Sequence, residues 1–497
     1  MQNYVGARSL SYTMPVEKVS GRASGKYHIS RYLNIIDLGR SALLFNGVNG
    51  CLDEVSGQPA DILKSGDAAQ FCLLNPKNLA ALIKRGHITT LSPEEELARF
   101  KEFSAALHRK IEKSNKRHGS IMLLLSYNCN LACNYCYQQR HRPHKSQARM
   151  TADLLNSVFE KHLSKIIPEA DPKNFDVSFY GGEPFLPSNI TIIRNALGYA
   201  KKYGMTASAI SNATEVNAMP EIFGPDCGFI SRIQISLDGS RELHDSSRVS
   251  ASGEKTFDKI TDNIAMLLGR KTKVSIRINL NRQTLESVPQ LIKELKAKNI
   301  LGNPYASIYA SPLHDNIAEV DAADFMDLSE LSAQVFKLGI DLEHPVSLRA
   351  NEMSYLFSLE KGIGLTHTCF CMQTMQRSLV VDPFGDLYAC FEEAGYPEFR
   401  VGHVSGSGVE FFPLHETYKT RHIANMDECL KCSVALACGG QCGVRSRAKT
   451  GDLFKPHCSD MKQVILDGLK FAYQKKRRNP GAGDSSPAAG GTISVHG

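Results

Sequence analysis

The sequence contains no run of about 18 consecutive apolar residues, so we expect no transmembrane helix. Its first residues, MQNYVGARSLSYTM, lack the charged start and apolar core of a secretory signal. The basic stretches at 99–118 and 475–478 show no pattern of interleaved aromatic residues that would argue for nucleic-acid binding. We therefore predict a cytoplasmic protein that binds neither a membrane nor nucleic acid.

Fourteen cysteines are present, and most of them are clustered. Three lie at 129–136 and eight between 369 and 458, whereas Cys51, Cys72 and Cys227 stand alone and are expected to be small buried hydrophobes. Because thiols stay reduced in the cytoplasm, the clusters indicate metal rather than disulfides. The first cluster has three thiols and no fourth beside them, which suggests a metal site with one position left open.

From residue 119 onward, apolar runs alternate with amphipathic stretches. Six strands are expected, at 121–127, 176–182, 206–213, 230–239, 273–281 and 305–311. Helical patterns lie between them at 152–167, 257–270 and 285–298. This alternation predicts an α/β fold with a parallel sheet and helical crossovers. Six units make a partial (β/α)6 TIM-like barrel, in which functional groups gather where the strands end.

The remaining composition divides the chain into six segments. We predict a small N-terminal α+β domain at 1–98, a basic linker helix at 99–118, the partial barrel at 119–315, a helical bridge at 316–365, a cysteine-rich C-terminal domain at 366–472 and a disordered tail at 473–497. Cysteines, glycines and short elements dominate the fifth segment, as expected where metal replaces part of a core. The tail is rich in Gly, Pro, Ser and Ala, which favours disorder.

The stretch CNLACNYCY places Cys129, Cys133 and Cys136 in a C-x3-C-x2-C spacing, directly after the first predicted strand. Cysteine thiolates hold iron–sulfur clusters, and three of them leave one iron of a cubane free. A zinc site is disfavoured, since no histidine lies nearby and the spacing is not that of paired knuckles. With Tyr135 before the third cysteine, the stretch resembles the signature of the radical SAM superfamily.

That resemblance implies a [4Fe–4S] cluster whose open iron binds S-adenosyl-L-methionine. It also implies reductive cleavage of this cofactor to a 5′-deoxyadenosyl radical, which abstracts hydrogen from a substrate. The stretch FYGGEP resembles the GGEP motif of the family. Gly181 and Gly182 would let the backbone approach the cofactor closely, and Glu183 would pair with its ammonium group. Tyr135 is expected to contribute to the same cofactor site.

Weaker matches to the family follow at later strand ends. SNA carries Ser211 and Asn212, where the family often has T-N-G. ISLDG carries Ser236, which would reach the cofactor, and Asp238, which would face the substrate side. Arg248, in HDSSR, would meet a carboxylate of the cofactor or of the substrate.

The C-terminal cysteines resemble the SPASM domain found on a subset of radical SAM enzymes. Their pattern includes G-x4-C at 385–390, C-x2-C-x5-C-x3-C at 429–442 and a last cysteine at 458. The resemblance implies two auxiliary [4Fe–4S] clusters, and hence three clusters in all. Ligands of the first would be Cys371, Cys390, Cys442 and, as the fourth, Cys369. Ligands of the second would be Cys429, Cys432, Cys438 and Cys458. The alternative is a pair of structural zinc sites.

SPASM enzymes largely modify peptides and proteins. The resemblance therefore implies a peptide maturase that installs a thioether or carbon–carbon cross-link on a ribosomally made precursor peptide. The segment 1–98 resembles precursor-recognition domains, which bind a leader by adding a strand to a sheet edge. An electron donor such as flavodoxin or ferredoxin is the second expected partner. The net charge of +7 is compatible with an acidic peptide. No catalytic acid or base can be named from the sequence.

Two alternatives remain. An anaerobic sulfatase maturase oxidises a Cys or Ser of its substrate to formylglycine. Those enzymes carry their cysteine loop near the N-terminus and an Asp after the G-x4-C cysteine, whereas Phe391 follows Cys390 here. A non-catalytic iron–sulfur scaffold would hold clusters without cleaving the cofactor, and Glu183 would then be dispensable.

Overall fold

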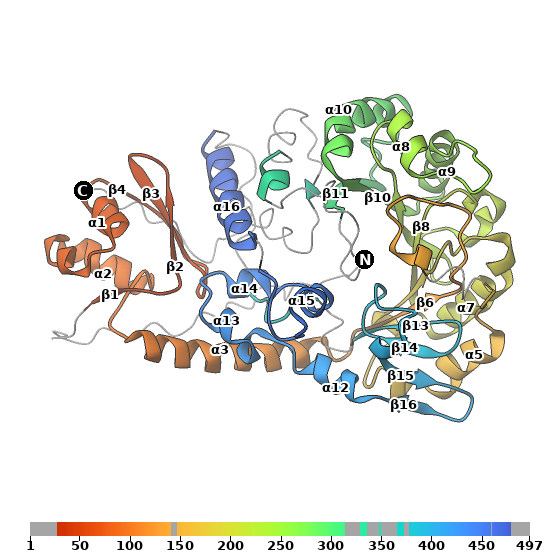
Figure 1. Ribbon diagram of the computed structural model, residues 1–497, viewed down its shortest axis with the longest axis horizontal. Coiled ribbons are helices and arrows are strands. Elements are labelled where there is room, and N and C mark those ends of the chain that lie inside the picture. Colours follow the sequence, from red (N-terminus) through yellow and green to blue (C-terminus); the bar gives the residue numbers. More distant parts are fainter. Residues whose placement is uncertain are drawn as a thin grey trace.

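The computed structural model describes residues 27–140, 147–313, 329–334, 347–348, 365–371, 377–458 and 460–478. An eleven-stranded sheet dominates this part of the chain, and helices cover its outer side (Figure 1). A three-stranded and a two-stranded sheet belong to the N-terminal region, which lies at the opposite end of the molecule.

Six parallel strands form the centre of the large sheet. They are β6 (Gly119–Leu124), β7 (Phe175–Tyr180), β8 (Thr206–Ser211), β9 (Ile230–Ser236), β10 (Lys273–Leu280) and β11 (Ala306–Pro312). Each pairs in parallel with the next along the chain, which confirms the predicted α/β architecture. Side chains alternate across each strand: on β10, Val274, Ile276 and Ile278 are buried in the core, so Arg277 and Asn279 point to the other face.

The crossover helices are α7 (Ile190–Tyr203), α8 (Arg241–Ser247), α9 (Phe257–Gly269) and α10 (Arg282–Ala297). The last two confirm the helices expected at 257–270 and 285–298. Helix α10 begins three residues early because Asn281 and Thr284 form a capping box.

The helix expected at 152–167 is divided, which corrects that prediction. It consists of α5 (Ala152–Asn156), a π-helical turn (Ser157–Lys161) and α6 (Leu163–Ile166). The Ser157 hydroxyl donates a 2.8 Å hydrogen bond to the Asp153 carbonyl, and such back-bonding distorts a helix.

The C-terminal region extends the same sheet. Strand β13 (Ser378–Val381) pairs in parallel with β6, and β14 (Asp386–Tyr388), β15 (Arg400–Val404) and β16 (Val409–Phe411) follow antiparallel. At the other edge, β12 (Ser347–Leu348) pairs with β11. The cysteine-rich region is therefore joined to the parallel strands by backbone hydrogen bonds.

Short helices complete the cysteine-rich region and lie between the N-terminal region and the sheet (Figure 1). They are α12 (Pro413–Lys419), α13 (Asp427–Leu430), α14 (Ala435–Cys438), α15 (Gly443–Thr450) and the longer α16 (Met461–Arg478). Helix α16 continues past residue 472, so the tail was predicted to start too early. Residues 479–497 and most of the predicted bridge at 316–365 lie outside the described residues.

The N-terminal region is built on a three-stranded antiparallel sheet. Its strands are β2 (Leu33–Asp37), β3 (Ser41–Asn46) and β4 (Leu52–Ser56). Helices α1 (Gln58–Ser65) and α2 (Pro76–Lys84) follow, and β1 (His28–Ile29) pairs with β5 (Ile88–Thr89). Leu44, Val55, Leu63, Phe71 and Leu82 form a separate hydrophobic core there.

Helix α3 (Pro93–Asn115) connects this region to β6 and runs beneath the cysteine-rich helices (Figure 1). It begins before residue 99 because the Ser92 side chain and Glu95 form a capping box, with Pro93 at the first turn. The boundary predicted between residues 98 and 99 therefore falls inside a helix and is wrong in that detail.

The N-terminal sheet docks directly on the loop that carries Cys432. The Tyr32 hydroxyl donates to the Leu430 carbonyl at 2.9 Å, and the Ser433 hydroxyl donates to Asn34 Oδ1 at 2.6 Å. A Cβ added to Gly47 would lie 1.7 Å from the Ser433 carbonyl oxygen, so the two backbones touch. Two regions about 400 residues apart in sequence thus share a tight contact.

The prediction that the isolated cysteines are buried is wrong for two of them. Cys72 and Cys227 are exposed rather than buried, because one lies in the surface 3-10 helix Ala68–Leu73 and the other in the loop before β9.

Among the described helices, none is both long and apolar enough to cross a membrane.

Candidate active site

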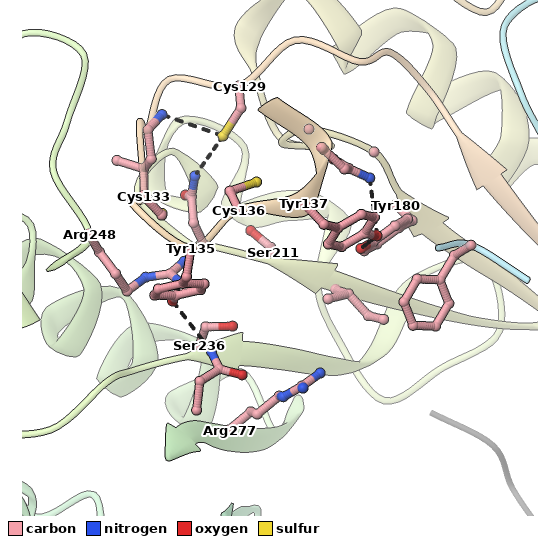
Figure 2. A pocket seen from close by; sticks show the side chains of 18 of the residues that line it. Cys129, Cys133, Tyr135, Cys136, Tyr137, Tyr180, Ser211, Ser236, Arg248 and Arg277 are labelled. Atoms are coloured by element: carbon pink, nitrogen blue, oxygen red, sulfur yellow. Dashed lines mark hydrogen bonds between the residues drawn. The ribbon is translucent and has the colours of Figure 1, made fainter. Parts of the chain in front are cut away.

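A pocket opens where the parallel strands end, and all three cysteines of the first cluster line it (Figure 2). Cys129, Cys133 and Cys136 lie on the loop that follows β6, as the sequence predicted. Of the expected cofactor contacts, Tyr135, Gly181, Gly182, Ser211, Asn212, Ser236 and Arg248 also line the pocket. The strands thus bring these distant residues to one place, while their contacts with a bound cofactor stay a prediction.

Gly181 and Gly182 let the end of β7 lie against the start of the cysteine loop. Gly181 has a φ of 142°, and a Cβ there would lie 2.4 Å from the Ser126 carbonyl oxygen. At Gly182 a Cβ would lie 2.0 Å from the Asn128 carbonyl oxygen. Backbone hydrogen bonds from Gly182 N to Ser126 O at 2.9 Å, and from Glu183 N to Asn128 O at 2.8 Å, complete the contact. Only glycine permits this approach.

The Glu183 carboxylate lies behind the pocket wall and is only 1% exposed. It accepts hydrogen bonds from Ser211 Oγ at 2.7 Å, Asn212 N at 2.8 Å and Phe185 N at 3.0 Å. Burial raises its pKa to about 7, although the three donors oppose that shift. Glu183 therefore holds the end of β8 in place, and its expected pairing with an ammonium group stays a prediction.

Asn212 connects this carboxylate to the cysteine loop. Its side-chain amide donates to Asn130 Oδ1 at 2.9 Å and contacts Cys129 Sγ at 3.8 Å, while the Leu131 N–H donates to the same sulfur at 3.4 Å (Figure 2). Two N–H groups are thus directed at one predicted cluster ligand.

Tyr135, Asp238 and Arg248 form a second buried network. The Tyr135 hydroxyl hydrogen-bonds to the Asp238 carboxylate and accepts from Arg248 Nη1 at 2.5 Å. Burial opposes the charge on Arg248, but the neighbouring Cys133, Tyr135 and Asp238 hold its pKa well above the usual value.

Asp238 does not line the pocket, which corrects its expected place on the substrate side. It accepts the Asn279 N–H at 2.9 Å and is 1% exposed. The carboxylate therefore joins β9 to β10 behind Tyr135.

The structure adds pocket residues that the sequence reasoning missed. Tyr137, Tyr180, Arg277, Phe391 and Glu392 all line the pocket. The Tyr137 and Tyr180 hydroxyls hydrogen-bond to each other, and the Phe391 ring meets Tyr180 edge-on at 5.2 Å. Arg277 carried a usable signal, because it alternates with buried residues on a predicted strand. The sequence singled out Phe391 only for its place after Cys390, and Glu392 comes from the same distant segment and carried no signal.

The C-terminal thiols fall into two neighbourhoods. Burial, together with the charges of Glu392, Cys442 and Cys371, raises the pKa of the Cys390 thiol. Burial, Glu392 and Cys371 likewise raise the pKa of Cys442 to about 12. Neutral thiols must lose their protons to become ligands, so a bound cluster would have to supply the compensating charge.

The second neighbourhood surrounds Cys429. Burial and the nearby Cys438, Cys432 and Cys458 raise the pKa of its thiol. Cys369 is buried, and its sulfur lies 3.7 Å from the Cys371 carbonyl oxygen. Its role as a fourth ligand stays a prediction, as do the other ligand assignments.

The residues present fit the predicted cluster and cofactor. Three thiols share one pocket with backbone that approaches closely at two glycines. Arg248 Nε is buried and has no hydrogen-bond partner in the described part of the chain, which suits a carboxylate of the cofactor. Within the described ranges, no group of three or more His, Cys, Asp or Glu residues is arranged to hold a metal ion.

Comparisons with known proteins agree with this geometry. A model of the radical SAM superfamily matches residues 123–295. The cysteine-type anaerobic sulfatase-maturating enzyme of Clostridium novyi (strain NT) is 31% identical over 182 residues, covering 35% of this chain and 46% of that protein. The radical SAM cyclopropyl synthase TigE of Paramaledivibacter caminithermalis is 21% identical over 468 residues, covering 86% of this chain and 91% of that protein. The chain thus spans less than half of the first relative and most of the second.

A solved structure, native anSMEcpe with bound AdoMet, has the same fold. Its TM-score is 0.54 at 18% identity, with 72% of this chain and 98% of that chain covered. The cysteine loop that opens the matched segment is also the loop that lines the pocket. Residues 123–295 thus form a radical SAM domain.

Proposed function

We propose that this chain is a radical SAM/SPASM peptide maturase that installs a cross-link on a ribosomally made precursor peptide. One observation carries the proposal: a single pocket is lined both by the cysteine loop and by Phe391 and Glu392, which follow Cys390. A substrate in this pocket would face both predicted cluster regions. That arrangement suits an oxidation in which hydrogen is removed at one side and an electron leaves at the other.

When bound, the first cluster and S-adenosylmethionine supply reductive cleavage of a sulfonium bond and a carbon radical that abstracts hydrogen. The residues of this chain hold and orient them. Cys129, Cys133 and Cys136 would supply the thiolates, and the glycines at the end of β7 let that strand lie against the loop that carries them. Glu183 holds Ser211 and Asn212 at the pocket wall behind them.

The relatives support a peptide or protein substrate. Several are named as sulfatase-maturating enzymes, and one solved structure of anSMEcpe contains AdoMet and the Cp18Cys peptide. TigE, whose alignment covers 86% of this chain, is named as a cyclopropyl synthase. A cyclopropyl group requires a new carbon–carbon bond, so this relative favours bond formation over conversion to formylglycine. The presence of Phe391 after Cys390 favours the same choice.

The N-terminal region is proposed to bind the leader of the precursor. Its three-stranded sheet has two edge strands, β2 and β4, and an extended peptide binds such an edge through backbone hydrogen bonds. The auxiliary thiols are proposed to hold two further [4Fe–4S] clusters, and flavodoxin or ferredoxin to supply electrons. Formylglycine formation and a non-catalytic scaffold are the competing functions.

The decisive experiment is anaerobic reconstitution followed by addition of dithionite and S-adenosylmethionine. We expect about twelve irons per chain, as three cubanes require, and formation of 5′-deoxyadenosine. A variant with Cys129, Cys133 and Cys136 all changed to Ala should form none and keep the auxiliary iron. Zinc in place of iron, or no 5′-deoxyadenosine from wild type, would refute the enzyme proposal.

The type of product is tested with a short peptide encoded beside the gene. Mass spectrometry should show loss of two hydrogens from the peptide and no reaction with a hydrazide. A product that forms a hydrazone would carry an aldehyde, which would establish the formylglycine alternative instead.

A further inference from the structure

The guanidinium group of Arg277 is a second cation in the pocket, in addition to that of Arg248. Arg277 lies on β10 and points into the pocket from the face opposite the buried Ile276 and Ile278 (Figure 2). In the described part of the chain, its side chain makes one hydrogen bond, from Nη2 to Ser311 Oγ at 3.3 Å. Its Nε is buried without a partner among the same residues, and no described carboxylate forms an ion pair with it.

The two arginines differ in their surroundings. Arg248 is held by Tyr135 and Asp238, and the nearby Cys133 thiolate would interact with it electrostatically. Arg277 lies at the other end of the pocket from Cys129 in Figure 2, beside Ser236 on the neighbouring strand. Arg248 is therefore placed at the cysteine side, and Arg277 at the side left for a substrate.

A guanidinium in such a position favours an anion with two oxygens. Its planar donors match a carboxylate in a bidentate geometry, and such charge-assisted pairs are strongest where water is partly excluded. Ser311 and Ser236 supply neutral hydroxyls on the two neighbouring strands. Glu392 also lines the pocket, and its charge acts on Cys390 and Cys442 as well as on Tyr180, but it forms no ion pair with Arg277 among the described residues.

We propose that Arg277 binds a carboxylate of the peptide segment that enters the pocket, most simply an Asp or Glu side chain near the modified residue. This inference rests on the proposed function, since it takes the pocket to receive a peptide. The overall charge of +7 would attract an acidic segment as well. The same carboxylate chemistry could come from S-adenosylmethionine, and the test separates the two sources.

The test measures binding to the anaerobic, reconstituted enzyme with two isosteric probes, N-acetylglutamate N-methylamide and N-acetylglutamine N-methylamide. Equilibrium dialysis gives both dissociation constants in the presence of S-adenosylmethionine. We expect wild type to bind the glutamate probe about tenfold more tightly, as loss of one charged hydrogen-bond partner implies. Arg277→Gln should remove this preference and Arg277→Lys should restore part of it.

A matched control and a second ligand complete the design. Lys273→Gln removes a charge from the exposed start of the same strand and should leave the preference unchanged. The dissociation constant of S-adenosylmethionine should also be unchanged in Arg277→Gln. Equal binding of both probes to wild type, or a preference that survives in Arg277→Gln, would overturn the proposal. A tenfold loss of cofactor affinity would assign Arg277 to the cofactor carboxylate instead.

The binding assay is independent of turnover. If the chain proves not to modify peptides, the probe preference can still be present, and the proposed function alone fails. If peptides are modified but the probes bind equally, only the assignment of Arg277 fails.

Discussion

Gly182→Ala should stop the cysteine loop from holding its predicted cluster and should spare the two proposed auxiliary clusters. The added Cβ would lie 2.0 Å from the Asn128 carbonyl oxygen and 2.4 Å from its carbonyl carbon. Real Cβ atoms do not approach closer than 3.0 Å, so Asn128 must move by about 1 Å. Both atoms in the way belong to the backbone, so no side-chain rotation relieves the clash.

Asn128 directly precedes Cys129, and its carbonyl accepts the Glu183 N–H at 2.8 Å. A shift of about 1 Å breaks that hydrogen bond and carries Cys129 with it. Metal-site ligands tolerate displacements of roughly 0.5 Å, so the loop should lose its hold on a cluster. Overpacking of this kind costs about 1–3 kcal/mol, which the rest of the fold should withstand.

The assay is iron content after anaerobic reconstitution, with electron paramagnetic resonance of the reduced protein. Gly182→Ala should lose about a third of the iron, about four of twelve, and should give no 5′-deoxyadenosine. Gly198→Ala is the matched control, because its Cβ meets nothing within 4 Å and Ala favours helix α7 by about 1 kcal/mol. Full iron content in Gly182→Ala would show that the contact does not position the loop.

Three further predictions follow from the buried polar contacts. Burial raises the pKa of Glu183 to about 7, so the protonated carboxyl stabilises the fold below pH 4.5 and about 3 kcal/mol of the free energy of unfolding is lost as the pH rises to 7. Melting temperatures measured across this range should therefore decline in wild type and not in Glu183→Gln. An equal decline in both proteins would contradict the assignment. Asn212→Ala removes an N–H directed at Cys129 Sγ, which should lower the reduction potential of the predicted cluster. A redox titration without S-adenosylmethionine should show a midpoint potential lower by roughly 59 mV, which is tenfold less reduced cluster at a fixed potential. An unchanged midpoint potential would refute this effect. Asn34→Ala leaves the Ser433 hydroxyl unpaired at a buried contact and should lower the free energy of unfolding by about 1–3 kcal/mol. Amide hydrogen exchange at 430–434 should become faster. Unchanged exchange would show that the contact is not needed to hold the N-terminal sheet against this loop.

Local sequence patterns were sufficient for much of the architecture. All six strands were found because apolar runs of β-type residues mark them, and helices α9 and α10 because their apolar residues recur at helical spacing. The predicted helix boundaries were wrong where a short-range polar contact, rather than the spacing of apolar residues, determined where the helix begins or breaks. The capping box at Ser92 moved the start of α3, and the Ser157 back-bond divided the helix at 152–167.

The site was recognisable only in part. The spacing of Cys129, Cys133 and Cys136 and the two glycines of FYGGEP are short-range features, so the sequence revealed them directly. The sequence could not show that Glu183 would face Ser211 and Asn212 rather than the pocket, because the direction of a side chain at a strand end depends on the neighbouring strand.

The sequence by itself determined the order of strands and helices, the two cysteine groups and the resemblance of the first group to the radical SAM signature. Only the tertiary structure decided which residues share the pocket. Arg277 shares the pocket with the cysteine loop through the pairing of β6 to β10, and Phe391 lines the same pocket because β13 pairs with β6 across more than 250 residues of sequence. Spacing along the chain records local geometry, whereas strand pairing and burial between distant segments determine which side chains come together.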